Sequence, residues 1–403
     1  MPEVSTVAIP ARRRDPLPAR SRVALVRCPD YDPGRLKAAV QRALDLLGGL
    51  PDSIGPGSRV FLKPNVMMPN PLGFPCNTHP EFIRAIVEIF RARGAAITVG
   101  ESAAGSQAGL TFTGRALKES GIESAARAAG ADVLNLDHGA VVERVLPNPI
   151  VPHIPIAKSA LDTDLLVLLP KFKTHAFANI ITGAVKLCYG TVPGQIKAEF
   201  HRRAPKPEPF FSIIRDLFEV LAPGLAIFDA VVGMEGDGPS AGKARPLGFL
   251  IASFDPIAAD AVASALVGID PLQVITTRLC DAAGLGHGRL ADIDICGEDM
   301  ASSTVRDFKL PKTAVPPAFL YRYLLGLTPT EPAINPKICT LCRTCSSSCP
   351  MGAITLRNSR MIIDRKLCIR CFCCAEVCPS QAITPKRRSR LGGLIARMLS
   401  SRW

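Results

Sequence analysis

Short apolar runs alternate with amphipathic segments over most of the chain. From Arg22 onward, runs rich in Val, Ile and Leu are separated by stretches whose apolar positions recur at helical spacing. Such runs predict buried strands, and the amphipathic stretches predict the helices that cover them. The pattern predicts strands at 23–28, 59–62, 96–100, 132–136, 165–169, 225–231, 247–253 and 292–296, and helices at 34–47, 80–93, 114–129, 210–221, 256–267 and 271–283. This alternation is typical of an α/β fold with a mostly parallel sheet and flanking helices.

Composition divides the chain further. The first residues are polar and rich in Pro and Arg, which is typical of disorder, and six prolines between Pro311 and Pro336 indicate a linker. A cysteine-rich stretch and a basic end follow. We therefore predict a disordered segment (1–21), an α/β domain (22–310), a linker (311–336), a small α+β cysteine-rich domain (337–385) and a basic amphipathic tail (386–403).

No apolar run in the 403 residues is long enough to cross a bilayer. Arg12-Arg13-Arg14 is followed by Asp15-Pro16-Leu17-Pro18, where an export signal needs an apolar segment. Because thiols stay reduced in the cytoplasm, the many cysteines agree with that compartment. We therefore expect a cytoplasmic protein.

Nine of the 14 cysteines lie between Cys339 and Cys378. Eight of them form two runs of the pattern Cys-x2-Cys-x2-Cys-x3-Cys-Pro, and the second run repeats the first after 29 residues. In bacterial two-cluster ferredoxins, which this stretch resembles, the fourth cysteine of each run ligates the other cluster. The pattern predicts two [4Fe-4S] clusters, held by Cys339, Cys342, Cys345 and Cys378 (cluster 1) and by Cys368, Cys371, Cys374 and Cys349 (cluster 2).

Zinc and disulfides are the alternatives to iron–sulfur clusters. Four-cysteine zinc sites use two CxxC pairs, which leaves the third CxxC step and the CxxxCP ending unexplained. Disulfides would require export. Cys373, beside Cys374, stands outside the pattern, and we interpret it as a packing residue. The motif therefore predicts electron transfer.

The net charge of +13 is unevenly distributed along the chain. Between Ala333 and Lys386, eight Lys and Arg residues face only Asp364 and Glu376 as acids. A basic surface attracts acidic partners, so we expect an acidic redox partner protein. Nucleic acid is not expected, because the aromatic content is 5% and no nucleic-acid-binding motif is present.

Polar clusters follow several predicted strands of the α/β part. Ligands of open α/β sheets bind at the carboxyl ends of strands, so these clusters predict a site for a small anionic substrate or cofactor. Isolated lysines of this kind are more often solvated loop charges, but here they are grouped with histidines and glycines. We predict His175, His201 and Lys186 as catalytic groups, and Lys63, Asn65, Lys171, Lys173 and Glu199 as substrate-binding groups.

Seven short motifs in this part resemble the DUF362 family. They are Lys63-Pro64-Asn65, Thr78-His79-Pro80, Gly100-Glu101-Ser102, Lys173-Thr174-His175, Thr182-Gly183-Ala184-Val185-Lys186, Lys197-Ala198-Glu199-Phe200-His201 and the segment 229–239. Members are often fused to ferredoxin modules, and no reaction is assigned to the family. Where relatives often read Lys-Asn-Leu-Phe-Gly, this chain has Lys186-Leu187-Cys188-Tyr189-Gly190, so a role for that asparagine does not carry over.

The end of the chain carries an apolar stripe. Leu391, Leu394, Ile395, Met398 and Leu399 fall on one helical face among basic residues. This pattern predicts peripheral contact with the inner face of a membrane or docking to a partner. The alternative is a short helix packed on the protein itself.

Three functions agree with these features. The leading hypothesis is a redox protein whose clusters relay electrons to or from the α/β domain, as in a ferredoxin-linked oxidoreductase. The alternative is an electron carrier or adaptor whose α/β domain docks a redox partner without catalysis. A cluster-handling accessory protein is the third.

Overall fold

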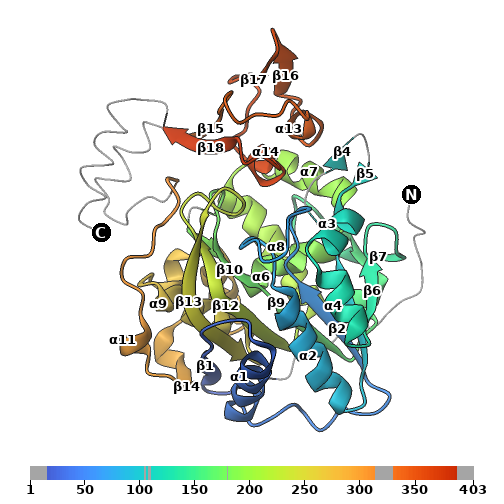
Figure 1. Ribbon diagram of the computed structural model, residues 1–403, viewed down its shortest axis with the longest axis vertical. Coiled ribbons are helices and arrows are strands. Elements are labelled where there is room, and N and C mark those ends of the chain that lie inside the picture. Colours follow the sequence, from blue (N-terminus) through green and yellow to red (C-terminus); the bar gives the residue numbers. More distant parts are fainter. Residues whose placement is uncertain (1–15, 104–105, 108–109, 179, 314–329, 388–403) are drawn as a thin grey trace.

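The computed structural model describes residues 16–103, 106–107, 110–178, 180–313 and 330–387. It consists of a large α/β domain and a small module that lies at one end of it (Figure 1). No helix in the described ranges is long and apolar enough to cross a membrane. Residues 1–15 of the predicted disordered segment, most of the predicted linker and the apolar stripe of the tail lie outside these ranges. Residues 16–21 were also predicted to be disordered, but Arg20 donates to Asp294 (2.6 Å) and Ser21 begins a strand of the sheet.

A mixed, mostly parallel sheet of ten strands forms the centre of the large domain. Its main strands follow the order β14-β1-β13-β12-β9-β2-β3-β6, and β13 runs antiparallel to both of its neighbours. The bounds are β1 Ser21–Arg27, β2 Arg59–Pro64, β3 Ala96–Glu101, β6 Asp132–Asn135, β9 Leu165–Leu169, β12 Leu225–Glu235, β13 Lys243–Ser253 and β14 Ile293–Gly297. β10 (Lys171–Thr174) pairs with β12 and with the short β11 (Ile181–Thr182). The α/β fold prediction is confirmed.

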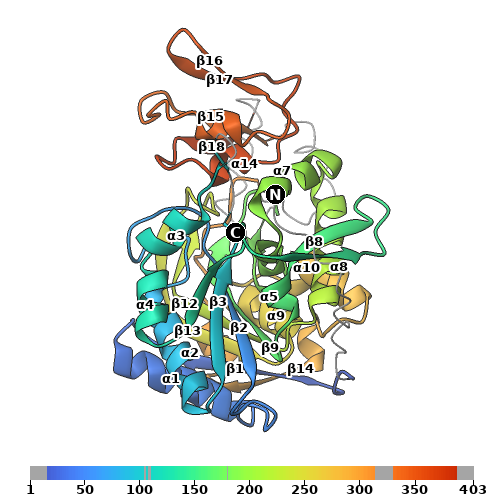
Figure 2. The same ribbon diagram turned by 90° about the vertical axis from the view of Figure 1, so that its right-hand side faces the viewer.

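Helices cover both faces of the sheet (Figure 2). One face carries α1 (Pro33–Leu46), α2 (Pro80–Ala92) and α4 (Ile122–Ala128), and the other carries α8 (Pro207–Leu221), α9 (Pro256–Leu266) and α10 (Ile275–Ala282). Successive strand residues point to opposite faces, so Phe61 of β2 packs in one core and Leu62 in the other. Both faces are buried, which explains why the strands are continuous apolar runs.

Two predicted helices are divided. The helix predicted at 114–129 is two helices, α3 (Thr113–Glu119) and α4, because Gly121 between them has a φ of 78°. Such a left-handed conformation cannot continue a helix. The helix predicted at 271–283 starts as a 3-10 turn (Pro271–Gln273) before α10 begins.

Several short elements were not predicted. They include a hairpin of β7 (Val141–Val145) and β8 (His153–Ala157), and β10, which coincides with the polar cluster after the strand predicted at 165–169. The remaining elements are β4 Ser106–Gln107, β5 Leu110–Thr111, α5 Lys158–Leu161, α6 Ala184–Leu187, the 3-10 turns Cys188–Thr191 and Leu290–Asp292, α7 Gly194–Arg203 and α11 Met300–Ser303.

The small module consists of two antiparallel sheets of two strands each and two short helices. β15 (Thr330–Ile334) pairs with β18 (Ile383–Arg387), and β16 (Ile354–Arg357) pairs with β17 (Arg360–Ile363). Its helices are α13 (Thr344–Ser347) and α14 (Cys373–Glu376). Residues 330–334 therefore belong to the module rather than to the predicted linker, and residues 386–387 belong to β18 rather than to the predicted tail.

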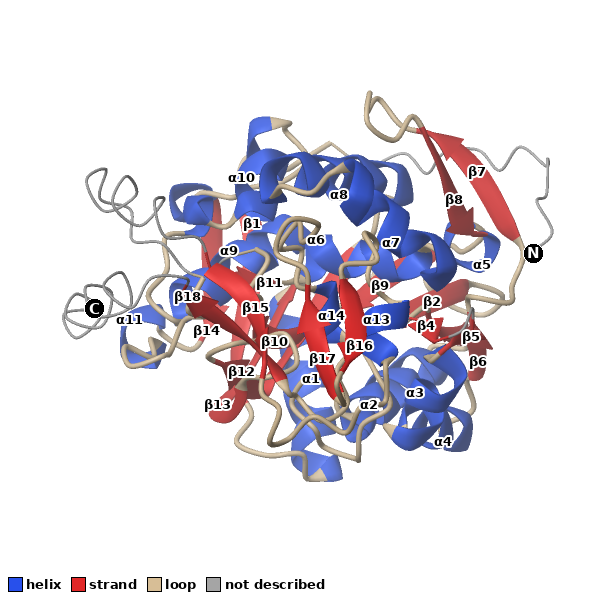
Figure 3. Cartoon of the chain, turned by 90° about the horizontal axis from the view of Figure 1, so that it is seen from above, coloured by secondary structure: helices blue, strands red, loops and turns tan. Residues whose placement is uncertain are grey.

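The module packs directly on the α/β domain. Seen from above, it lies over the middle of the α/β domain (Figure 3), and α13 contacts the short segment at Ser106–Gln107. Ser240 Oγ donates a hydrogen bond to the Ala375 carbonyl (2.8 Å), and Ala176 is buried in the apolar core of the module. This contact places the cysteine-rich loops over the segments that follow β2, β3 and β10.

Candidate functional site

The structure brings the eight cysteines of the repeated pattern into two groups. One cavity of the module is lined by Cys339, Cys342, Cys345 and Cys378, and another by Cys349, Cys368, Cys371 and Cys374. These are the two predicted sets, each containing three cysteines of one run and the last cysteine of the other. Four convergent thiols are the donor set that a [4Fe-4S] cluster requires, so the residues present fit two clusters.

The backbone repeats along with the cysteines. Leu341 and Arg343 have left-handed φ angles of 57° and 62°, and Arg370 and Phe372, 29 residues later, both have 60°. These turns curl each cysteine loop around its cavity. The Ala353 amide donates to Cys349 Sγ (3.3 Å), and the Ala382 amide donates to Cys378 Sγ (3.2 Å). Amide donors of this kind stabilise thiolate ligands and tune cluster potentials.

The two cysteine groups differ in exposure. Cys342 of the first group is exposed, and Ile338 and Leu341 beside it are 48% and 39% exposed. In the second group, Cys371 and Cys374 are buried, and Cys371 packs in the core of the α/β domain. Cys345 and Cys378 of the first group are buried as well, so the groups differ at two positions: Cys342 gives the first group an exposed ligand, and Cys371 places the second group against the large domain.

A cavity of about 210 Å³ lies between the module and the α/β domain. The large domain contributes segments that follow β2, β3 and β10, together with α6 and α7, and the module contributes α13 and α14. Four predicted site residues line it: Asn65, His175, Lys186 and His201. Polar residues that were not assigned to the site also line it: Glu101, Ser102, Lys197, Tyr189, Cys373 and Glu376.

Lys186 is the cation of this cavity that has no protein partner. It lies on α6, and no described residue forms a hydrogen bond or an ion pair with its ammonium group. Asp260 holds the start of this helix by accepting hydrogen bonds from the Ala184 and Val185 amides (2.6 and 3.2 Å). Gly183 is required there, because a Cβ would lie 2.2 Å from Asp260 Oδ1. Asp260 therefore positions Lys186.

Three buried polar atoms of the cavity lining lack hydrogen-bond partners. They are Asn65 Oδ1, His175 Nε2 and His201 Nδ1. His175 Nε2 lies 3.3 Å from Glu376 Oε1 of the module, without hydrogen-bond geometry. Burial lowers the pKa of His175 well below its usual value, and the nearby Lys186 adds to the effect. Burial likewise lowers the pKa of His201 to about 3. Unsatisfied buried atoms are rare in proteins, so their grouping in one cavity indicates a bound ligand.

Lys63 lies behind the cavity wall in a buried ion pair. Its Nζ is 2.5 Å from Glu101 Oε1, and both side chains are at most 2% exposed. Burial lowers the pKa of Lys63 and raises that of Glu101, and the attraction between the two groups opposes both shifts. The pair sits under Gly190, where a Cβ would lie within 2.5 Å of both side chains.

Lys173 and Lys171 are buried but do not line the cavity. Lys173 donates to the Cys76 carbonyl (2.9 Å), and burial lowers its pKa to about 8. Lys171 is paired with Asp229 (2.8 Å) and Tyr31 (2.7 Å). The charge of Lys173 acts on the cavity, because it helps to lower the pKa of His175. The charge of Lys171 is neutralised by Asp229.

Glu199 lies outside the cavity. It accepts hydrogen bonds from Arg202 (2.7 Å) and Arg203 (2.8 Å), which lower its pKa to about 2. Lys197 and His201 are four residues apart on α7 and therefore share the face that lines the cavity. In a helix, Lys197 shares a face with His201 and Glu199 does not, so helical spacing would have predicted Lys197 rather than Glu199 as a site residue.

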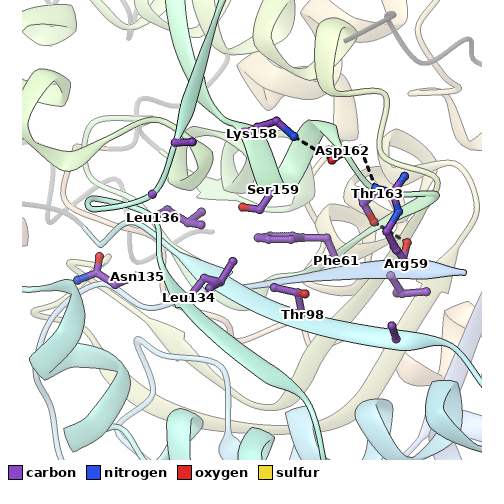
Figure 4. Close-up of a pocket in the computed structure, with 14 residues that line it drawn as sticks. Arg59, Phe61, Thr98, Leu134, Asn135, Leu136, Lys158, Ser159, Asp162 and Thr163 are labelled. Carbon is purple, nitrogen blue, oxygen red and sulfur yellow. Dashed lines mark hydrogen bonds and ion pairs between the residues drawn. The ribbon is translucent and has the colours of Figure 1, made fainter. Parts of the chain in front are cut away.

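A second cavity, of about 390 Å³, lies against β2, β3 and β6 beside α5 (Figure 4). None of the predicted site residues lines it. Its charged groups are paired with one another, Lys158 with Asp162 (3.0 Å) and Arg59 with Asp162 (2.8 Å). It therefore offers less to a charged ligand than the interdomain cavity does.

The fold and the cysteine groups define an α/β protein with a C-terminal 4Fe-4S dicluster module. The dicluster domain matches residues 331–379, which identifies the module as an iron–sulfur electron-transfer domain. The family described as "Domain of unknown function (DUF362)" matches residues 60–265, and the chain belongs to this family. Both family predictions are confirmed.

A curated relative supports the assignment along most of the chain. The thylakoid-associated protein sll1697 of Synechocystis sp. is 30% identical over 296 residues, which are 73% of this chain and 89% of that protein. The lactate racemase apoprotein from Thermoanaerobacterium thermosaccharolyticum shows 15% identity and a TM-score of 0.31, with 53% of this chain and 51% of that one covered. A TM-score this low does not show that the two proteins share a fold.

Proposed function

We propose that the protein is a ferredoxin-linked oxidoreductase that acts on a small anionic molecule in the interdomain cavity. The observation that carries the proposal is the make-up of the cavity walls. One wall holds Lys186 and two histidines, and the other holds Cys373 and Glu376, which flank cluster 2 ligands in sequence. When bound, the clusters supply electrons one at a time.

The charges around the cavity favour an anion. No described residue forms an ion pair with Lys186, while Lys197 lines the same wall and Lys173 lies behind it. Glu376 of the module is the acid that these three lysines act on, since burial raises its pKa and their charges oppose that shift. Glu101 faces the cavity but is already paired with Lys63. A carboxylate or phosphate next to Lys186 would receive the charge-assisted hydrogen bond that no described residue provides.

His175 and Asn65 would orient the molecule. Asn65 Oδ1 accepts from no group in the described part of the chain, so it would select a ligand that carries an O–H or N–H donor. His175 presents Nε2 on the module side of the cavity, 3.3 Å from Glu376. Proton transfer during a reduction is the role we propose for His175, with Glu376 beside it as the group that exchanges the proton.

Changing Lys186 to methionine tests the anion site. Loss of one charge-assisted hydrogen bond costs about 1.5–3 kcal/mol, or roughly a 10- to 150-fold loss of affinity. We expect native mass spectra of the anaerobically purified protein to show two clusters and a stoichiometric extra mass, which Lys186→Met loses.

The exposed Lys243, changed to methionine, is the control and should keep the extra mass. The oxidoreductase proposal would be contradicted by two results together. The wild type would carry two clusters and no extra mass, and no small anion would bind more weakly to Lys186→Met than to the wild type. The alternative, a carrier or adaptor without catalysis, would then hold.

We also propose that an acidic electron-carrier protein docks beside cluster 1. The exposed Cys342 is surrounded there by the apolar Ile338 and Leu341 and by the basic Lys337 and Arg343. Such a rim steers acidic proteins, and steering weakens with salt. With reduced flavodoxin as an acidic probe, we expect Arg343→Glu to slow cluster reduction about tenfold at low salt. Equal rates for Arg343→Glu and the control Lys243→Glu would refute this docking face.

A peripheral membrane location is the further proposal for the tail. The relative in Synechocystis is named as thylakoid-associated, and the basic apolar stripe of residues 386–403 is the pattern of an interfacial anchor. Deletion of residues 388–403 should abolish sedimentation with anionic liposomes. Unchanged sedimentation of the truncated protein would show that the tail is not the membrane anchor.

A further inference from the structure

Cys373 is the thiol of the module that belongs to neither group of four. It begins α14, directly after Phe372, whose left-handed φ of 60° turns the chain at this point. Its side chain lines the interdomain cavity, and its sulfur lies within 4.8 Å of that of Cys371, a cluster 2 residue. A packing role alone does not explain a thiol that borders a polar cavity.

His201 approaches the same place from the α/β domain. Its ring stacks on Phe210, with centroids 4.1 Å apart, and meets the edge of Phe177 at 5.2 Å. The side chain is only 6% exposed, and its Nδ1 has no hydrogen-bond partner. Aromatic packing therefore holds an imidazole whose buried nitrogen is unsatisfied in the protein, which calls for a ligand.

These side chains come together as a possible ligand set. One ligand atom each of His201, Cys371 and Cys373 lie within 4.8 Å of one another. Bond lengths of about 2.3 Å to sulfur and 2.0–2.1 Å to nitrogen place the donors of a tetrahedral ion about 3.5–3.8 Å apart, so shifts of about 1 Å complete the site. We propose that His201, Cys373 and Cys371 bind one thiophilic transition-metal ion, with Cys371 Sγ shared between this ion and cluster 2.

The donors define the class of metal. Two thiolates and one imidazole favour zinc, iron, nickel or copper over magnesium or calcium. Binding forms a bond from the metal to Cys373 Sγ and releases the thiol proton to solvent, and a thiolate retains lone pairs with which to bridge two metals. His201 and Cys373 line the same cavity as Lys186 and His175, so a molecule bound there could supply a fourth ligand.

This site deepens the proposed function. An ion there would hold a donor atom of the anionic molecule while Lys186 pairs with its charge. Because metal binding is measured without the molecule, the metal site and the anion site can fail independently.

Zinc is the probe, since its X-ray absorption edge is separate from that of cluster iron. The full-length protein with both clusters is incubated anaerobically with Zn2+, desalted and analysed for zinc and iron. We expect about one zinc per chain, ligated by two sulfurs and at least one imidazole nitrogen, with about eight irons retained. Cys373→Ser and His201→Gln should lower bound zinc at least tenfold, whereas His201→Cys should retain it.

Matched controls are Cys296→Ser on β14 and the exposed His153→Gln, which should bind zinc like the wild type. Equal zinc in Cys373→Ser and wild type, with intact clusters, would overturn the proposal. So would zinc uptake accompanied by an equivalent loss of iron, since the thiolates would then come from a broken cluster. No zinc in the wild type, while Lys186-dependent anion binding persists, would overturn the metal site and leave the anion site standing.

Discussion

Changing Cys378 to alanine is expected to remove cluster 1, although Cys378 ends the run that supplies most ligands of cluster 2. Cys378 lines the same cavity as Cys339, Cys342 and Cys345. A cube that loses one of its four thiolates is lost or degraded, so iron should fall from about eight to about four per chain. Iron analysis and the electron paramagnetic resonance spectrum of the reduced protein measure both results.

Comparing the residual spectra of several cysteine variants shows which cysteines bind the same cluster. Cys339→Ala and Cys378→Ala should leave the same residual spectrum, and Cys368→Ala and Cys349→Ala should share a different one. Cys373→Ala is the matched control and should retain about eight irons, since it belongs to neither group. If the residual spectrum of Cys378→Ala instead matched that of Cys368→Ala, Cys378 would be a ligand of cluster 2. The fourth cysteine of each run would then bind the cluster of its own run.

Changing Lys63 to methionine is expected to destabilise the α/β domain by about 3–5 kcal/mol. Lys63 is fully buried, and its removal leaves the Glu101 carboxylate without its ion-pair partner in the interior, with only the more distant charge of Lys197 acting on it. The amides of Val66 and Ser102 also donate to Glu101 (both 2.9 Å), but they do not neutralise its charge. The loss should appear in anaerobic urea unfolding followed by far-UV circular dichroism.

A double variant separates the charge from the packing. Lys63→Met with Glu101→Gln removes both charges and keeps an oxygen acceptor for one of the two amides, so part of the lost stability should return. The surface pair Lys37–Glu88 (2.8 Å) is the control, and Lys37→Met should cost less than about 1 kcal/mol. If Lys63→Met cost no more than Lys37→Met, the buried pair would not be a structural ion pair.

The sequence predicted the architecture because local patterns determine it. The strand β9 is five buried aliphatic residues in a row, and α9 begins with a Pro after the capping Asp255. Errors occurred where one residue changes the backbone, as at Gly121, and where polar residues form a strand, as in β10. There, a backbone angle or pairing with β12 outweighs the local pattern.

The candidate site was only partly predictable for a different reason. The types of residue in the motifs indicated chemistry, but not which side chains face one another. Lys171 and Lys173 are two residues apart on one strand, yet Lys171 is neutralised by Asp229 and Lys173 lies near the cavity. Glu101 was quoted in a family motif without a role, and it is the partner of Lys63.

The sequence by itself predicted the two groups of four cysteines, the alternation of strand and helix and the charged motifs at strand ends, because spacing along a chain constrains the geometry of a loop, strand or helix. Only the tertiary structure decided that Lys186, His201 and Cys373 border one cavity. They come from two domains, and the distance between them depends on how the module packs against the α/β domain. That packing is a sum of many weak contacts spread over both surfaces, which no short motif encodes.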